Sequence, residues 1–219
     1  MIGQIPLETS LSFITNLLGV VAIFIMVITM VIKLVNHHNK TNTWDIIRIL
    51  MVIWFLGILY FNTWEFLYYS TPLQANIPLS WIDTDYSTIV VQSLSVPVVI
   101  VCGLYIVGHA NKWVILKIVP IIYYAVVILL IVLFDFNLLY LASMLIGYLA
   151  ILVFLIFTGV KLKDNGALGL AIFFILTTFV GVTDFYIKFI LGIIAYCFGI
   201  YFALGYFKPF KSKTSIPNE

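Results

Sequence analysis

Residues 137–160 read NLLYLASMLIGYLAILVFLIFTGV and contain no charged side chain. A helix crosses the hydrocarbon core of a bilayer with about 20 consecutive, mainly apolar residues, so this stretch is long enough to span it. Its apolar residues are continuous rather than alternating, which excludes a strand of a membrane barrel. Because lipid offers no partner to backbone N–H and C=O groups, the stretch must be a helix.

Similar apolar runs fill most of the 219-residue chain, in which only 9% of residues are charged. Soluble domains contain about 25% charged residues, and the mean hydropathy here is +1.17. We predict an all-α integral membrane protein, a seven-transmembrane-helix bundle that forms one domain over residues 1–219. The predicted spans are 11–35, 45–69, 87–108, 113–134, 137–160, 166–183 and 185–207.

The charged residues predict the orientation of this bundle. Ten of the eleven Lys and Arg residues lie in or beside the first, third and fifth connections and the tail, namely Lys33, Lys40, Arg48, Lys112, Lys117, Lys161, Lys163, Lys208, Lys211 and Lys213. The remaining connections and the N-terminal arm contain Glu8, Asp83, Asp85, Asp135 and Asp184, with Glu65 close by. Basic residues of short loops stay in the cytoplasm. The N-terminus is therefore expected outside and the C-terminus in the cytoplasm.

Two segments suggest an internal repeat. Residues 17–23 (LLGVVAI) resemble residues 145–151 (LIGYLAI), and the same shift of 128 residues aligns Lys33 with Lys161. Spans 1 and 5 would run in the same direction, so spans 1–3 and 5–7 could be parallel repeats joined by span 4. Parallel repeats are one known transporter architecture. Chance similarity between two apolar segments is the alternative explanation.

Lys188 is the basic residue that violates the orientation pattern, and it lies one turn after Asp184, on the same helix face. Charged residues inside a bilayer are costly and usually face a cavity or the bundle interior. We therefore hypothesise an outward-facing pocket for a substrate or ion, lined by Asn62, Glu65, Gln92, Ser95, Asp184 and Lys188. The alternative is that these side chains extend to the outer interface and that Asp184 and Lys188 form a surface pair.

Two resemblances accompany these features. The stretch Asp184-Phe185-Tyr186-Ile187-Lys188 resembles the Asp-x-x-x-Lys motif of microbial rhodopsins, whose last helix holds retinal on the Lys. The expected Trp-x-x-Tyr-Pro of span 6 does not occur in this chain. The three-plus-one-plus-three outline is similar to that of SWEET and PQ-loop transporters, although spans 1 and 5 contain no Pro-Gln pair.

We expect a small-solute transporter or permease. The alternatives are a membrane sensor or accessory subunit without its own catalysis and, third, a retinal-binding, rhodopsin-like protein. An enzyme is not favoured, because the spans contain no cluster of His, Asp or Glu in the middle or inner bilayer. We expect no metal and no cofactor. The expected partners are the lipid bilayer, a small molecule or ion and, for the alternative function, another protein, but no nucleic acid. The predicted location is a prokaryotic plasma membrane.

Overall fold

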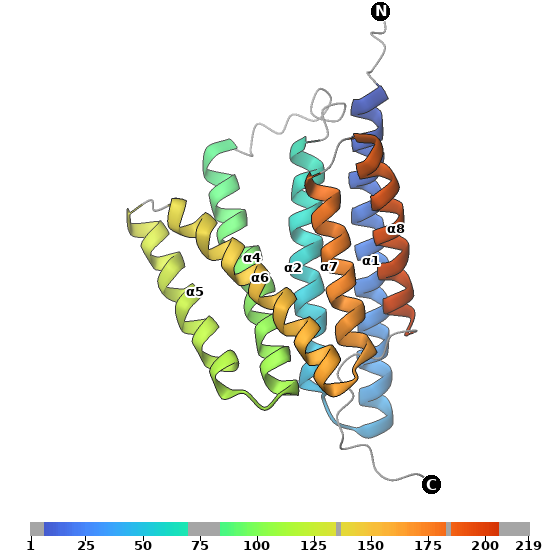
Figure 1. Ribbon diagram of the computed structural model, residues 1–219, viewed down its shortest axis with the longest axis vertical. Coiled ribbons are helices and arrows are strands. Elements are labelled where there is room, and N and C mark those ends of the chain that lie inside the picture. The colour runs from blue at the N-terminus through green and yellow to red at the C-terminus, as the bar shows by residue number, and fades with distance from the viewer. Residues whose placement is uncertain (1–6, 70–83, 135–136, 183–184, 206–219) are drawn as a thin grey trace, which may run out of the picture.

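The computed structural model describes residues 7–69, 84–134, 137–182 and 185–205. Within them the chain forms seven helices and no strand (Figure 1). The helices are α1 (Leu7–Thr41), α2 (Ile46–Tyr69), α4 (Thr84–Ala110), α5 (Val114–Phe134), α6 (Asn137–Leu162), α7 (Asn165–Val182) and α8 (Phe185–Leu204). Except for α1, which is longer at both ends, each helix matches a predicted span to within a few residues. The predicted all-helical architecture is therefore confirmed.

Four helices are long and apolar enough to cross a membrane, through the segments Phe13–Thr41, Ile46–Thr63, Ala142–Leu162 and Tyr186–Leu204. The described parts of α4, α5 and α7 contain the shorter apolar segments Ser95–Ala110, Val114–Leu130 and Asn165–Val180. Large apolar side chains also lie on the outside of the bundle, where Ile115 is 71% exposed and Leu145 is 63% exposed. Such a surface suits lipid better than water. The molecule has the character of a membrane protein, whereas the count of seven spans and their orientation stay predictions.

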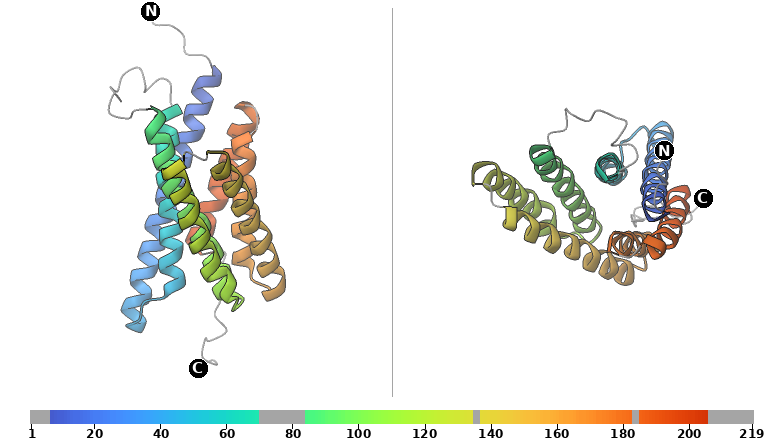
Figure 2. Two further views of the ribbon diagram at one scale, coloured as in Figure 1. Left: turned by 90° about the vertical axis from the view of Figure 1, so that its left-hand side faces the viewer. Right: turned by 90° about the horizontal axis from the view of Figure 1, so that it is seen from above.

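Six of the helices form a closed ring. Successive helices run in opposite directions, so that α1, α4, α6 and α8 begin at one end, called the amino-terminal end here, and α2, α5 and α7 at the opposite end (Figure 1). Around the ring, α1 contacts α2, which contacts α4, followed by α6, α7, α8 and again α1. Helix α5 packs against α4 and α6 from outside (Figure 2). The ring is the frame of the candidate site.

Small residues let α1 and α8 approach closely. A Cβ atom added to Gly192 would lie 2.8 Å from Thr15 Cγ2, and one added to Gly199 would lie 2.8 Å from Met26 Sδ. Ala195, between the two glycines along the chain, is fully buried. Backbones that approach this closely gain van der Waals contact, which drives helix association in lipid. This contact closes the ring.

Helix α5 is attached to α6 through two tyrosines and one serine. The Tyr124 hydroxyl donates a hydrogen bond of 2.8 Å to the Ser143 carbonyl oxygen, and the Tyr123 hydroxyl lies 2.9 Å from Ser143 Oγ. Both bonds hold α5 on the outside of the ring. Their polar groups are thereby paired in a region where water is scarce.

Candidate functional site

A cavity of about 390 Å³ lies inside the ring, toward the amino-terminal end. Its described lining comes from all six ring helices. The polar lining residues are Asn16, Asn62, Tyr148, Thr177, Thr178, Lys188 and Tyr196, and the apolar ones are Ile23, Ile58, Phe61, Val96, Val99, Phe173 and Val180. Cavities of a few hundred Å³ with mostly apolar walls and a few polar groups are typical of small-molecule sites. We therefore take this cavity as the candidate functional site.

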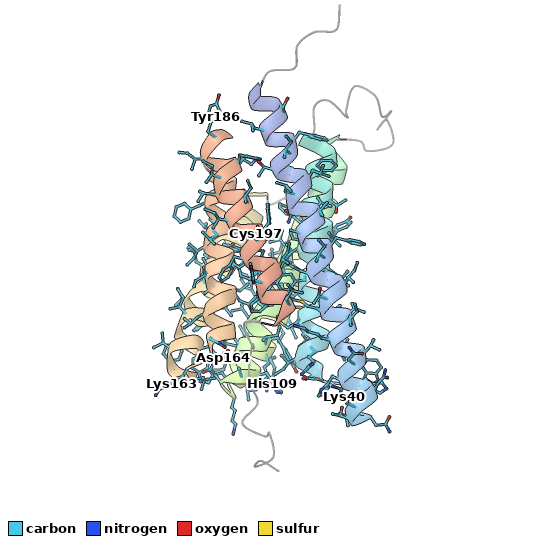
Figure 3. The ribbon with its side chains drawn as sticks, turned by 90° about the vertical axis from the view of Figure 1, so that its right-hand side faces the viewer. Lys40, His109, Lys163, Asp164, Tyr186 and Cys197 are labelled. Atoms are coloured by element: carbon cyan, nitrogen blue, oxygen red, sulfur yellow. The ribbon has the colours of Figure 1, made fainter. Side chains whose placement is uncertain are left out.

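Lys188 supplies a cation to the cavity. It lies in the first turn of α8 and is half-buried, and its neighbour Tyr186 marks the amino-terminal end of the bundle (Figure 3). The structure shows no ion pair for Lys188 with any residue that it describes. The predicted partner, Asp184, lies outside the described residues. An ammonium group in such a position attracts an anion, and the more strongly the less water surrounds it.

Three hydroxyl groups in the cavity wall have their hydrogens engaged within the protein. Thr178 Oγ1 donates to the Phe174 carbonyl oxygen at 2.7 Å, the Tyr148 hydroxyl lies 3.0 Å from the same oxygen, and the two hydroxyls are 2.9 Å apart. Thr177 Oγ1 lies 3.1 Å and 3.0 Å from the carbonyl oxygens of Phe173 and Phe174. Each hydroxyl has one hydrogen to donate. Only the lone pairs of these hydroxyl oxygens are therefore available to a ligand, so the three groups act as hydrogen-bond acceptors.

Besides the Tyr196 hydroxyl, two amide side chains complete the polar part of the described wall. Asn62 Nδ2 donates one hydrogen bond of 2.9 Å to the Ile58 carbonyl oxygen, one turn back along α2. Its second N–H and its side-chain oxygen are not used in this bond. Asn16 makes no hydrogen bond to any described residue through its side chain. Both amides can therefore offer donors and acceptors to a ligand.

An aromatic cluster lies next to the cavity on the side of the opposite end and contributes Phe173 to its lining, and we call this cluster the floor. It consists of Trp54 and Phe55 from α2 and Phe173 and Phe174 from α7, all buried. The rings of Trp54 and Phe174 stack with centroids 5.2 Å apart, and those of Phe55 and Phe173 lie 6.2 Å apart. The Trp54 indole N–H is buried without a hydrogen-bond partner among the described residues. The floor thus joins two helices that are not neighbours in the ring.

The structure brings two of the six predicted site residues to the cavity, Asn62 and Lys188. Ser95 is buried on α4 beside the lining residue Val96, but it is not part of the described lining. The side chains of Glu65 and Gln92, and the whole of Asp184, lie outside the described residues. Asn16, Tyr148, Thr177, Thr178 and Tyr196 were not among the predicted site residues. The available signal was that each is a polar residue inside an apolar run.

Within the described residues there is no group of three or more His, Cys, Asp or Glu side chains that could hold a metal ion. Comparison with known proteins adds no relative: the chain matches no family model, no curated protein and no solved structure.

Proposed function

We propose that this chain is a seven-span transporter or permease for a small solute, with its N-terminus outside and the cavity as its outward-facing binding site. The observation that carries the proposal is the cavity itself, which is lined by six helices and by the Lys188 cation. Transporters bind their substrates near the middle of the bilayer, between bundles of helices. A purely structural bundle would gain more stability by filling such a space with side chains.

The distribution of charge supports the orientation. Lys40, His109 and Lys163 lie at the opposite end of the bundle (Figure 3). Basic residues near the ends of spans stay in the cytoplasm, which makes the opposite end cytoplasmic. In this orientation the cavity lies in the outer half of the membrane, and the floor separates it from the cytoplasm.

The positions of equivalent residues support the three-plus-one-plus-three repeat. The shift of 128 residues places buried residues of α1 on buried residues of α6, namely Thr15, Gly19 and Ile23 on Ser143, Gly147 and Ile151. A shift of 119 residues relates residues of α2 to residues of α7 that are all buried or half-buried, namely Trp54, Phe55, Ile58 and Phe61 to Phe173, Phe174, Thr177 and Val180. Helix α5, the connector in this scheme, lies outside the ring. The cavity and its floor would then lie between the repeats, as in other transporters.

The floor is also the observation that favours a second candidate, a ligand-binding sensor or accessory subunit. Trp54 and Phe55 have no exposed surface, so a solute in the cavity cannot reach the cytoplasm unless α2 and α7 rearrange. A sensor needs only to bind its ligand and to change shape. Transport additionally requires that the floor open.

Uptake into proteoliposomes tests the proposal. A panel of radiolabelled metabolites and ions is offered to vesicles containing the intact chain, Lys188→Met or Glu65→Gln. We expect uptake of at least one solute by the intact chain and a reduction of about ten-fold or more with Lys188→Met, because the variant removes the charge that binds the solute. Lys117→Met, a matched change on α5 outside the ring, should transport normally. Vesicles that take up no solute of the panel would favour the sensor or subunit.

A further inference from the structure

The chemistry of the cavity wall restricts the class of molecule that fits it. The described lining contains one formally charged group, the Lys188 ammonium, so a net anionic or zwitterionic ligand can bind with its anionic group next to Lys188. The ammonium makes no ion pair with a described residue. A half-buried ammonium with no charged partner among the described residues would gain an ion pair from a bound carboxylate.

A second part of the wall suits a hydrogen-bond donor rather than an acceptor. The hydroxyl hydrogens of Tyr148, Thr177 and Thr178 are engaged with one another and with the carbonyl oxygens of α7. These three oxygens therefore face a ligand as acceptors. The aromatic rings of Phe61 and Phe173 lie in the same wall, and the faces of aromatic rings attract cations. An ammonium group on the ligand can both donate hydrogen bonds to these oxygens and interact with the aromatic rings.

Apart from Asn16, Asn62 and Tyr196, the rest of the described wall is apolar. Ile23, Ile58, Val96, Val99 and Val180 offer aliphatic surface with no hydrogen-bonding atoms in their side chains. A ligand that presented further hydroxyl groups to this surface would lose hydrogen bonds to water without replacement. This part of the wall therefore favours a hydrocarbon group on the ligand.

We propose that the cavity binds a small apolar amino acid as its zwitterion. The carboxylate pairs with Lys188, the ammonium is bound by the oxygens of Tyr148, Thr177 and Thr178, and the aliphatic side chain lies along the apolar wall. This assignment rests on the proposed function and specifies its substrate class.

Three matched probes test the assignment on the purified intact chain in lipid nanodiscs. They are leucine, 3-methylbutylamine, which lacks the carboxylate, and 4-methylpentanoate, which lacks the ammonium. Isothermal titration should give a Kd for leucine at least about ten-fold lower than for either analogue, because each analogue leaves one polar part of the wall unpaired. Equal affinity for leucine and 4-methylpentanoate would show a site for simple carboxylates and overturn the proposal.

Variants locate the two charged groups of the ligand. Lys188→Gln should weaken leucine binding by about ten-fold or more but should not weaken the binding of 3-methylbutylamine, which has no carboxylate. Lys188→Arg should retain leucine binding. Thr178→Val should weaken the binding of leucine and of 3-methylbutylamine, but it should not weaken the binding of 4-methylpentanoate. Lys117→Gln, a change of the same charge outside the ring, should bind leucine as the intact chain does. Unchanged leucine affinity in Lys188→Gln would exclude the assigned carboxylate position.

The assignment and the proposed function can fail separately. If proteoliposomes take up another solute but the chain does not bind leucine, the proposed transport function stands and the proposed zwitterionic substrate is wrong. If the chain binds leucine but takes up no solute, the proposed zwitterion site stands and the proposed transport function is wrong. Since binding and uptake are measured independently, each result identifies which of the two statements is wrong.

Discussion

Asp164 is a carboxylate that is almost completely buried, with 8% of its surface exposed. Its Oδ1 accepts hydrogen bonds from the backbone N–H groups of Gly166, at 2.8 Å, and Ala167, at 3.1 Å. It therefore caps the N-terminus of α7, where backbone donors have no partner within the helix. Because α7 carries Thr177 and Thr178, this cap helps to fix one wall of the cavity.

Replacement of Asp164 should destabilise the protein measurably. We expect Asp164→Ala to lower the free energy of unfolding by about 1 kcal/mol, and Asp164→Ser to recover most of this loss because a serine hydroxyl can also cap a helix. Unfolding in detergent, followed by tryptophan fluorescence, measures the change. Asn165→Ala, at the exposed neighbouring position, is the control. Equal stability of Asp164→Ala and the intact chain would mean that water replaces the cap at no cost.

At the scale of the helix, the contact between α1 and α8 decides whether the ring closes. A Cβ atom on Gly199 would lie 2.8 Å from both Met26 Sδ and Phe173 Cε2, and both of these residues are buried. A larger side chain at this position must therefore displace α8 from α1 and disturb the floor.

Gly199→Leu should lower the stability of the bundle by about 1–3 kcal/mol, the usual cost of overpacking. It should also weaken ligand binding, because Phe173 belongs to both the floor and the cavity wall. Cys197→Leu places the same bulk on the exposed face of the same helix and should change neither property. Thermal unfolding and ligand titration compare the two variants. A Tm of Gly199→Leu equal to that of Cys197→Leu would contradict the close contact.

At the scale of the whole molecule, the orientation decides from which side the cavity is reached. Tyr186 lies at the amino-terminal end and Lys163 at the opposite end (Figure 3), and both are exposed. Cysteine accessibility therefore reports the orientation, once the native Cys102 and Cys197 have been replaced by alanine. The basic residues at the opposite end predict that this end is cytoplasmic.

We expect a membrane-impermeant maleimide to label Tyr186→Cys in intact cells, and to label Lys163→Cys only after the membrane has been permeabilised. Lys40→Cys, at the same end as Lys163, should behave like Lys163→Cys. The reverse pattern would place the cavity in the inner half of the membrane and invert the proposed direction of access. Labelling is scored by the change in mobility on a gel.

The helices can be predicted from the amino-acid sequence alone. Helix α5 was predicted at 113–134 and is observed at Val114–Phe134, and α6 was predicted at 137–160 and is observed at Asn137–Leu162. The cause is local, because a long apolar run in lipid can satisfy its backbone hydrogen bonds only as a helix. Lys188 could also be identified from the sequence, because a charge inside an apolar run is costly and usually faces a cavity or the bundle interior.

Which polar residues meet in the cavity depends on how the helices pack, and the sequence does not show this. Asn16 and Tyr148 line the cavity with Lys188 although the three residues lie far apart in the sequence, whereas Ser95, a predicted site residue, is buried outside the described lining. The order of helices around the ring and the rotation of each about its axis depend on contacts such as those at Gly192 and Gly199. In lipid, all faces of an apolar helix are nearly equivalent, so shape-dependent packing rather than hydrophobicity selects the inner face.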